Sequence, residues 1–573
     1  MADIDEVKKR RKQWEEGTLK NAIERFKLKE NPNRFYTPAD IKDFDFLEKI
    51  GFPGEYPFTT SEYPVVIPRR VEEEDSRPAV ARVTAGAYSG FGTAEDTRDY
   101  YKQVRSPGPN VAFQLPTQCG YDSDSPEARG EVGKVGVAID TLRDFEVLYE
   151  AFTGDRDLDR IASNWTINGL TNIILAMYIA IAEKRGIPIN KLRGTPQNDI
   201  LKEYLGRGTQ NFPPRPSMRM TRDTIVYCTK HMPLINWISI SGHHVRDAGA
   251  TVVQACAFQQ TNMIAYVQTG IDAGLDIDEF VPRMTLYVGT CGGMEFFENI
   301  AAVRANRRMC AKILKERFKA KNPRSWIPRD LGAAAAGLSS CRLQRPLNNL
   351  TRGVIGGVMG ALSGGQPSGG TPFDEPLGLG HSPEAQQLSK DATRIMMDEC
   401  HLGEVIDPLA GSYYVESLTD KMESEIQKVV NDIEARGGAV ACIETGYSQR
   451  MVSKSAHQFQ SDLASGRTVI VGVNKYTSES EIEVMPSRLV PEYDPRKREE
   501  AEEKQLLNLA RVKRERDNAQ VKATLARLKD AAKDESVNLI PPLVESVKAY
   551  ATVGEMAGTL REVFGEFISP SIF

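Results

Sequence analysis

Residues 195–207 read TPQNDILKEYLGR, and this stretch decides the fold because it runs from the end of a strand straight into a helix. Thr195 and Gln197 stand at the strand end. The polar side of the helix carries Asp199, Lys202 and Glu203. Arg207 ends the helical run, where its planar, permanently charged guanidinium can turn back toward the strand end and hold a carboxylate. A surface helix without a binding role is the alternative interpretation of this segment.

The same alternation of a short apolar run and a helical run extends on both sides of this stretch, over residues 81–395. The predicted strands are NVAFQLPT (110–117), SNWTIN (163–168), GTPQN (194–198), NWISISG (236–242), RMTLYVG (283–289), SWIPRDLG (325–332) and VMGALSGG (358–365). Such alternation indicates an α/β fold with parallel strands joined by crossover helices. Roughly eight units in roughly 300 residues predict a closed (β/α)8 TIM barrel rather than an open sheet.

Two other regions flank the predicted barrel. Residues 1–80 are predicted to form an N-terminal arm and a wrapping segment, with a charged amphipathic helix over 1–30. That helix either folds back onto its own chain or embraces a partner subunit. Residues 396–573 are predicted to be a helical C-terminal region, in which 495–532 forms a long exposed helix or a helix pair.

Composition excludes several classes of function. The net charge of −5 over 573 residues gives no nucleic-acid footprint. The eight cysteines form no CxxC pair and no Cys/His cluster, so no metal site is predicted. The charged N-terminus is not a signal peptide, and no apolar run is long enough to cross a membrane. These features predict a soluble, cytoplasmic protein.

In a TIM barrel the chemistry lies at the C-terminal ends of the strands. Polar residues of this chain gather at those predicted ends: Gln114, Thr117, Gln118, Asn164, Thr166, Thr195, Gln197, His243, His244, Arg283, Thr285, Arg329 and Asp330. The Gly- and Asp-rich loop at 120–142 is long enough to predict a functional role, although it has no phosphate-binding or EF-hand signature. The Gly-rich run at 363–372 would let a bulky ligand approach the backbone, or is simply a flexible loop.

Several sequence blocks together resemble the methylmalonyl-CoA mutase family of adenosylcobalamin-dependent acyl-CoA mutases. They are FGTAEDT (91–97), FQLPTQCGYDSD (113–124), GEVGKVGVAIDT (130–141), TPQNDILKEYLGR (195–207), PPRPSMR (213–219), ISISGHH (238–244), IDPLAGSYYVE (406–416), IVGVNKY (470–476) and ATVGEM (551–556). None of the six histidines lies in a DxHxxG motif, which carries the cobalt-ligating histidine in members with a fused cobalamin domain. The resemblance therefore implies a large, substrate-binding subunit without the flavodoxin-like cobalamin-binding domain.

The resemblance also implies a cofactor and partners. Adenosylcobalamin would be bound with its cobalt ligated by a histidine of a small cobalamin-binding subunit, in a hetero-oligomer. The C-terminal region would lead to or contact that subunit, and an acyl-CoA would be the substrate. A G-protein chaperone is a further partner that the family allows. The reaction implied is a radical rearrangement of the carbon skeleton of a CoA thioester.

Site residues follow from the resemblance, position by position. Tyr88, His243, His244 and Gln197 match catalytic positions, with Tyr88 between substrate and corrin and His244 donating to the migrating carbonyl. The substrate positions are Arg207, Thr166, Asn164, Thr195, Asn236, Arg283 and Thr285. The cofactor positions are Phe113, Leu115, Gln118, Gly90, Asp247, Gln366 and Glu375. Arg207 matches the residue that holds the free carboxylate of a malonyl- or succinyl-type substrate, where relatives acting on monocarboxylic acyl groups tend to have Gln.

Departures from the family pattern bear on the substrate. His243 replaces the usual Tyr, which makes its protonation a pH variable. RVTAGAY (82–88) lacks the usual aromatic and arginine pattern. Leu331, Ala333 and Gly337 replace a larger His, Gln and Trp, and this loss of volume predicts a bulky alkyl or aryl substituent on a dicarboxylic acyl-CoA.

Three alternatives stay open. The neighbours of the small residues repack, and the substrate is methylmalonyl-, isobutyryl- or 2-hydroxyisobutyryl-CoA. The chain is instead a catalytically inactive assembly or binding subunit, although the match at Tyr88, Gln197, Arg207 and His244 argues against it. The last alternative is an unrelated barrel enzyme, such as a lyase.

Overall fold

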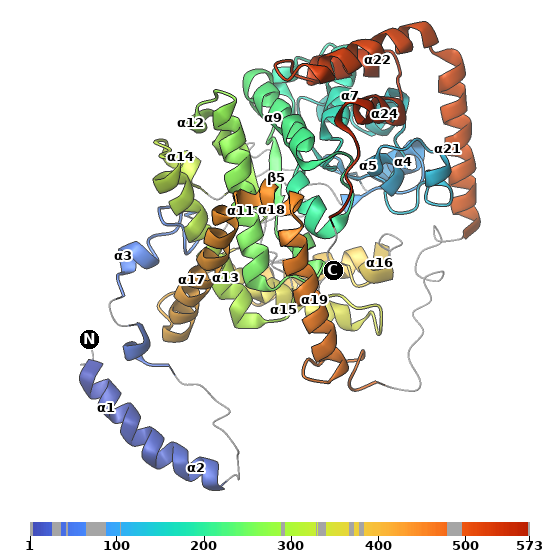
Figure 1. Cartoon of the computed structure of the whole chain (residues 1–573). Coiled ribbons are helices and arrows are strands. Elements are labelled where there is room, and N and C mark those ends of the chain that lie inside the picture. The colour runs from blue at the N-terminus through green and yellow to red at the C-terminus, as the bar shows by residue number, and fades with distance from the viewer. Residues whose placement is uncertain are drawn as a thin grey trace.

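The protein is a mixed α/β structure in which short parallel strands are covered by helices (Figure 1). The computed structural model describes residues 4–25, 36–41, 44–64, 88–103, 105–287, 293–327, 329, 340–365, 372–377, 383–477 and 495–570. Within these ranges no helix combines the length and the apolar character that crossing a bilayer requires.

The strands pair in chain order and run parallel. β1 (Tyr88–Ser89), β2 (Asn110–Ala112), β3 (Ala162–Thr166) and β4 (Arg193–Pro196) form one sheet, while β5 (Ile238–Ser241) and β6 (Met284–Tyr287) form a second. A parallel bridge between Gly194 and Ile235 links β4 to the segment that enters β5. Beyond β6, Leu286 N–H donates to the carbonyl of Arg329. Backbone hydrogen bonds therefore connect the strands from β1 to residue 329.

The strand predictions at 110–117, 163–168, 194–198, 236–242 and 283–289 are confirmed as β2 to β6, whereas β1 was not predicted. The predicted strand at 358–365 is wrong, because its first residues lie in the helix α15 (Asn348–Leu362). A short apolar run cannot be assigned to strand or helix by its periodicity alone. A closed eight-stranded ring is not found among the described residues, whose strands form the four-stranded and two-stranded sheets.

The predicted strand at 325–332 begins inside the helix α14 (Pro323–Trp326), and most of its second half lies outside the described residues. The positions Leu331, Ala333 and Gly337, on which the prediction of a bulky substrate rests, also lie outside them. The structure therefore does not address that prediction.

β3 shows how the strands separate a core side from a polar side. Ser163 and Trp165 are buried against the helix layer, where Trp165 Nε1 donates to Tyr149 OH over 2.9 Å and Ser163 Oγ donates to Tyr178 OH over 3.1 Å. Asn164 and Thr166 alternate with them and keep partial exposure on the opposite side. This is the period-two pattern of a strand with two different faces.

The helices follow the strands as crossover connections and additional cover. Up to residue 326 they are α3 (Phe46–Lys49), α4 (Ala94–Gln103), α5 (Leu115–Cys119), α6 (Leu142–Leu148), α7 (Thr171–Lys184), α8 (Ile200–Lys202), α9 (Pro214–His231), α10 (His243–Asp247), α11 (Val252–Asp272), α12 (Ile277–Phe280), α13 (Phe296–Lys312) and α14. Later in the chain lie α15, α16 (Pro383–Arg394), α17 (Tyr413–Ala435), α18 (Gly438–Glu444) and α19 (Tyr447–Ala464). α7 is buried on nearly all sides, as a helix between a sheet and an outer layer must be.

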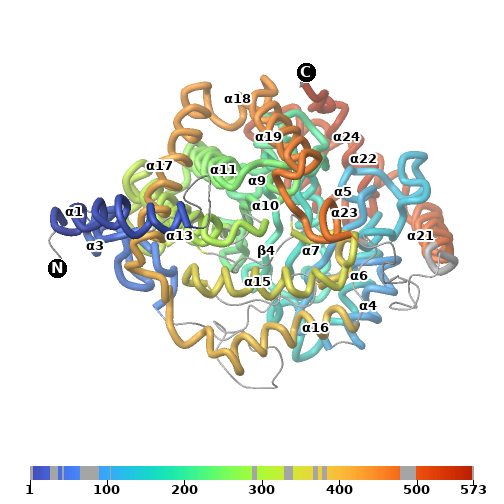
Figure 2. The backbone as a smooth tube through the Cα atoms, turned by 90° about the horizontal axis from the view of Figure 1, so that it is seen from below, coloured from blue at the N-terminus to red at the C-terminus, as the bar shows by residue number. Residues whose placement is uncertain are grey.

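The N-terminal helical arm is confirmed for residues 4–25. α1 (Ile4–Trp14) continues through a π-helical turn into α2 (Lys20–Arg25), and none of these three elements contains a buried residue. The arm extends from the body in both views (Figures 1 and 2). Arg11 Nη1 donates to both carboxylate oxygens of Asp40, each over 3.1 Å, which attaches the arm to the segment that follows it.

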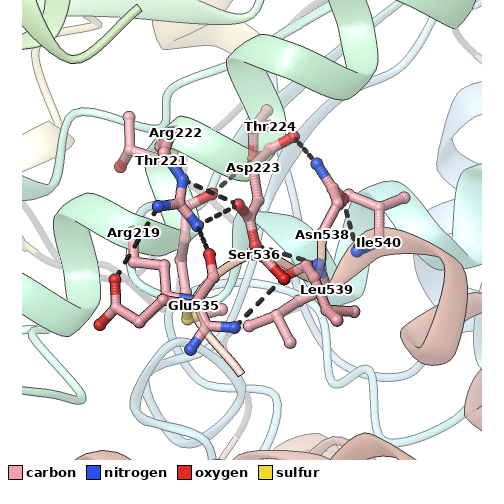
Figure 3. Close-up of polar contacts among 12 residues, drawn as sticks. Arg219, Thr221, Arg222, Asp223, Thr224, Glu535, Ser536, Asn538, Leu539 and Ile540 are labelled. Atoms are coloured by element: carbon pink, nitrogen blue, oxygen red, sulfur yellow. Dashed lines mark hydrogen bonds and ion pairs between the residues drawn. The ribbon is translucent and has the colours of Figure 1, made fainter. Parts of the chain in front are cut away.

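The C-terminal part of the chain is helical, and the stretch predicted at 495–532 is a helix pair. α21 (Pro495–Glu515) and α22 (Asn518–Lys533) are followed by α23 (Ile540–Lys548) and α24 (Val553–Phe564). Figure 3 shows how the turn after α22 is attached to α9. Asp223 Oδ2 accepts the N–H of Leu539 over 3.0 Å, and Arg222 donates to the carbonyl of Glu535 over 2.8 Å. Arg219 also donates to the carbonyls of Ala531, Ala532, Asp534 and Val537.

The loop at 120–142 also attaches the C-terminal helices. Gln505 Nε2 on α21 donates to the buried carboxylates of Asp140 (2.7 Å) and Asp144 (3.2 Å). Asp122 accepts from Thr552 Oγ1 over 2.7 Å and lies 3.2 Å from Lys513 Nζ. The predicted functional role of this loop therefore includes a structural one.

Candidate active site

β4 ends in a sharp turn in which the side chains of Gln197, Asn198 and Asp199 have different environments. Gln197 is fixed on both sides, since its N–H donates to Trp165 O and its carbonyl accepts from Ser239 N–H, each over 2.9 Å. Asn198 then adopts a left-handed conformation (φ 51°), which asparagine tolerates better than most residues, and its amide donates to Trp237 O. Asp199 follows, fully buried beneath the turn, where Tyr266 OH donates to its carboxylate over 2.8 Å.

The helix after this turn has its charged residues inside the protein, so the alternative interpretation of the segment as a surface helix is wrong. Lys202 and Glu203 are at most 1% exposed and form an ion pair of 2.7 Å. Burial lowers the pKa of Lys202, an effect that Glu203 and Asp199 partly offset. Burial would raise the pKa of Glu203, but the charges of Lys202 and Arg207 bring it below its ordinary value. The lowered pKa of Glu203 favours its carboxylate form, which faces the Lys202 Nζ at 2.7 Å.

Arg207 ends a π-helical turn (Glu203–Arg207), a form of helix that is often found at functional sites. Its Nη1 is 3.8 Å from Glu203 Oε1, and no residue of the described ranges accepts a hydrogen bond from this buried atom. The adjacent Gly206 lets α10 pack against the turn, because a Cβ there would lie 2.7 Å from the carbonyl oxygen of His244. The sequence thus brings Arg207 and the histidine pair together.

His243 and His244 begin α10, directly after β5, with ring centroids 3.8 Å apart. His243 Nδ1 lies 2.5 Å from Ser241 Oγ, and His244 Nδ1 is buried without a hydrogen-bond partner in the part of the chain that the structure describes. Burial, then the charges of Lys202 and Arg207, lower the pKa of His243 to about 3. Burial and the neighbouring His243 lower that of His244 well below its ordinary value. The predicted change of protonation of His243 in the ordinary pH range is therefore wrong, because both rings stay neutral.

The predicted substrate residues form a row across adjacent strands. β3 and β4 pair Asn164 with Thr195, and Asn236 Nδ2 donates to Thr195 Oγ1 over 3.0 Å. Thr166 lies two residues after Asn164 on the same face of β3 and pairs with Ala112 of β2. Thr285 on β6 pairs with Ser239, and its hydroxyl donates to the carbonyl of Ile238 over 2.8 Å. The strands thus present small polar groups on one face.

Four arginines cluster near the N-terminal ends of β4 and β6. Arg193 begins β4 and Arg283 immediately precedes β6. Burial, followed by the positive charges of Arg329, Arg324 and Arg193, lowers the pKa of Arg283. Arg329 Nη1 donates to Asn236 Oδ1 over 3.1 Å, which joins this arginine cluster to the polar row. Arg283 was predicted at the C-terminal end of a strand, and this is wrong, because it is the first residue of the predicted run RMTLYVG and precedes β6. The arginine cluster could not be recognised from the sequence.

The predicted cofactor residues fall into two groups. At the end of β2, Leu115 is 47% exposed, Gln118 Nε2 donates to the carbonyl of Phe113, and Gln118 Oε1 is buried without a partner in the described ranges. The Phe113 side chain belongs to the core, and Gly90 touches Ala112, where a Cβ would overlap its carbonyl oxygen.

The second group comprises Asp247 at the end of α10 and Glu375 after α15. Burial raises the pKa of Cys341 to about 11, and the charges of Glu375 and Asp247 also raise it, so each of these two predicted residues lies near Cys341. Gln366 lies outside the described residues, and of Tyr88 only the backbone in β1 is described.

Sequence reasoning missed Asn168 and the role of Lys202. Asn168 Nδ2 donates to both Gln197 Oε1 (2.9 Å) and Glu203 Oε1 (2.6 Å), and Lys202 Nζ donates to the same two oxygens (3.0 and 2.7 Å). Asn168 ends the predicted strand SNWTIN, which was a signal for its position at the strand end. No sequence signal showed that a lysine on a helix would point inward.

Comparison with known proteins identifies the family of this chain. The family profile described as methylmalonyl-CoA mutase matches residues 27–566. The chain is 39% identical to the 2-hydroxyisobutanoyl-CoA mutase large subunit of Aquincola tertiaricarbonis, over 94% of this chain and 92% of that protein. The chain belongs to the methylmalonyl-CoA mutase family. It is also 37% identical to the methylmalonyl-CoA mutase of Escherichia coli (94% of this chain, 71% of that protein) and 36% identical to the human mitochondrial enzyme (90% and 65%).

The predicted family is confirmed, and with it an isomerase of the cobalamin-dependent acyl-CoA mutase type. This family uses adenosylcobalamin. The chain spans almost all of a relative named as a large subunit, but about two thirds of the methylmalonyl-CoA mutases. A relative named as a large subunit implies a small-subunit partner.

Proposed function

We propose that this chain is the large, substrate-binding subunit of an adenosylcobalamin-dependent acyl-CoA mutase. The observation that carries the proposal is a continuous polar path along the strands. At one end lies the arginine cluster of Arg193, Arg283, Arg324 and Arg329. Thr195 and Asn236 connect it toward the other end. There Arg207 lies close to His244 and to Glu203, and Lys202 and Asn168 join Glu203 to Gln197. A molecule with phosphates at one end and an acyl thioester at the other fits this order of groups.

Each part of the path then has a role in binding. The arginine cluster attracts the phosphates of CoA, for which planar guanidinium groups are well suited. The amides and hydroxyls on the strands hydrogen-bond the pantetheine arm. Neutral His244 and the amide of Gln197 hold the acyl group by hydrogen bonds, without placing a charge beside it. In this proposal the strands close around the substrate as a TIM barrel, and the site excludes water from a reactive radical.

The cofactor requires a surface that is partly apolar and partly able to accept hydrogen bonds. Exposed Leu115 and the nearby Gln118 Oε1, which accepts no hydrogen bond from any described residue, fit the face of a corrin ring with amide substituents. Asp247 and Glu375 would approach it from the end of β5 and from the segment after α15. Adenosylcobalamin, when bound, supplies the radical chemistry of the rearrangement.

We expect the small cobalamin-binding subunit to dock beside this surface. Arg345 and Arg352 donate to the carbonyls of Tyr476 and Val471 and so join the start of α15 to the segment after α19. Exposed apolar side chains gather on these two segments: Leu343, Leu347, Val354, Val471 and Tyr476. Apolar patches of this kind on soluble proteins mark interaction sites. Leu343→Glu with Tyr476→Glu is expected to abolish co-elution with the small subunit.

The comparisons favour a small acyl group over the bulky one predicted first. The relatives named above act on 2-hydroxyisobutanoyl-CoA or are methylmalonyl-CoA mutases, and both substrates are among the alternatives from the sequence. We therefore propose a small, branched acyl-CoA as the substrate. The buried Nη1 of Arg207, which has no acceptor among the residues that the structure describes, favours a substrate that carries a carboxylate.

The test is reconstitution of the chain with a cobalamin-binding small subunit and adenosylcobalamin. The substrates would be 2-hydroxyisobutanoyl-, methylmalonyl-, isobutyryl- and benzylmalonyl-CoA, with cob(II)alamin absorbance and rearranged product as readouts. Turnover of a small acyl-CoA would support the proposal. Turnover of benzylmalonyl-CoA alone would instead support the first prediction, a substrate with a bulky substituent. Binding of acyl-CoA without cob(II)alamin or product from any of them would favour an inactive binding subunit.

A further inference from the structure

The orientation of the Gln197 side chain is set by two nitrogens that donate hydrogen bonds to it, Asn168 Nδ2 and Lys202 Nζ. The backbone N–H of Asp199 donates to Asn168 Oδ1 over 2.9 Å, so the Asn168 amide nitrogen must point the other way. That nitrogen donates to Gln197 Oε1. The ammonium of Lys202, which has no acceptor capacity, donates to the same oxygen over 3.0 Å. The two donors together exclude the flipped amide, in which a nitrogen would face them.

This arrangement uses both lone pairs of the Gln197 carbonyl and leaves its amide nitrogen available. No residue of the described ranges accepts a hydrogen bond from Gln197 Nε2, and this atom is not sealed from solvent. The side chain is therefore fixed as a pure donor on the side where a ligand binds. An acceptor without charge, such as a thioester carbonyl, is the group that it suits.

Lys202 is poorly explained by stability alone. A lysine that is 0% exposed loses its hydration, and a buried ion pair is often no more stabilising than well-packed apolar residues of the same volume. The pair with Glu203 is completed by Asn168 and by Thr209, whose hydroxyl donates to Glu203 Oε2 over 2.6 Å. The protein thus maintains a buried network that reaches the ligand side by hydrogen bonds to Gln197 and by the charge attraction between Glu203 and Arg207.

We propose that Lys202, together with Asn168, is a positioning residue that fixes the Gln197 carboxamide as a hydrogen-bond donor to the thioester carbonyl of the acyl-CoA. Lys202 itself does not touch the substrate and acts through Gln197. The proposal rests on the proposed function, because it requires a CoA thioester in this site. It predicts that loss of the network weakens recognition of the carbonyl and leaves recognition of the CoA moiety intact.

The experiment compares two ligands on the chain without cofactor, by calorimetry. Butyryl-CoA carries the thioester carbonyl, and S-butyl-CoA lacks it. We expect the wild type to bind butyryl-CoA more tightly by about 10-fold, the value of roughly one net hydrogen bond. In Lys202→Met/Glu203→Gln, which removes both charges together, the ratio of the two dissociation constants should fall toward one. Asn168→Ala, which leaves the ion pair in place, should lower the ratio partway.

Two control variants separate positioning from general damage. Thr209→Val disturbs Glu203 from the side away from Gln197, so it should lower the melting temperature and keep the ligand ratio. Gln197→Leu should abolish the preference for the carbonyl, and adding the Lys202/Glu203 changes to it should cause no further loss of preference. A ratio unchanged in both the Lys202/Glu203 and Asn168 variants would overturn the inference while acyl-CoA binding stands. A wild type that binds neither ligand would overturn the proposed function and this inference with it.

Discussion

Arg207 Nη1 lies 3.8 Å from Glu203 Oε1, a distance at which the charges attract each other but no hydrogen bond forms. Glu203 Oε1 already accepts from Lys202 and Asn168. The carboxylate therefore orients the guanidinium and leaves Nη1 without an acceptor in the described ranges. A buried donor without an acceptor costs about 1–3 kcal/mol, which a bound carboxylate would offset.

Arg207→Gln tests whether the substrate carries that carboxylate. For methylmalonyl-CoA we expect kcat/KM to fall about 100-fold, because a charge-assisted hydrogen bond of roughly 2–3 kcal/mol is lost. For 2-hydroxyisobutanoyl-CoA, which has no free carboxylate, we expect a change of less than about 3-fold. The measurement is steady-state kinetics of the reconstituted complex with both substrates. Equal losses for both would show that Arg207 maintains the site rather than selecting the substrate.

The arginine cluster predicts a strong effect of salt on CoA binding. Arg283→Gln is expected to weaken binding of CoA about 10-fold at low ionic strength, and less at high salt, where the attraction between charges is screened. Arg160 is a matched control, because its side chain is exposed and its Nη1 lies 4.0 Å from Asp155 Oδ1. The variant Arg160→Gln should leave the affinity for CoA unchanged. Calorimetric titrations at two salt concentrations would measure both. If the affinity for CoA depended on salt equally in the wild type and in Arg283→Gln, the phosphates of CoA would bind away from Arg283.

Much of the site could be predicted because strand ends are visible in the sequence. Gln197, His243 and His244 each follow a run of β-prone residues, and parallel strands bring such ends together. The polar row of Asn164 and Thr195 likewise follows from alternation along a strand.

The environment of these residues could not be predicted. Lys202 and Glu203 look like the exposed face of a helix, but a π-helical turn and tertiary packing bury them. The neutrality of His243 depends on burial and on charges that are distant in the sequence or lie on another element. α15 was mistaken for a strand because its glycine-spaced apolar run has the length of one.

Stability should fall in mild acid because of the histidine pair. The folded-state pKa values of His243 and His244 lie below 6.5, so the unfolded chain binds protons first as pH decreases. Their contribution to stability is largest well above pH 6.5 and is lost progressively as pH falls below it, by about 1.4 kcal/mol for His243 at pH 5.5. Guanidinium unfolding of wild type and His243→Asn at pH 8 and 5.5 would measure the difference. The variant should lose less stability than the wild type, and a parallel loss would contradict the neutral state of His243.

The docking of α21 should weaken as pH rises. Burial and the neighbouring carboxylates of Asp144 and Asp122 raise the pKa of Asp140 to about 7. A carboxyl group with a raised folded-state pKa stabilises the fold most below its unfolded value near 3.8, and this contribution is lost as pH rises through about 7. Because Gln505 joins Asp140 to α21, we expect faster amide exchange in residues 500–515 at pH 8 than at pH 5, after correction for intrinsic rates.

Asp140→Asn tests this origin of the pH dependence. The amide oxygen can still accept the N–H of Ser123, which Asp140 Oδ1 accepts over 2.8 Å, and Gln505 can turn its unpartnered Oε1 toward the new amide nitrogen. We expect exchange in α21 to become independent of pH between 5 and 8. Asp530→Asn, at an exposed carboxylate on α22 whose pKa is lowered by Lys533, should behave as the wild type. If Asp140→Asn retains the pH dependence of the wild type, a group other than Asp140 controls the docking of α21.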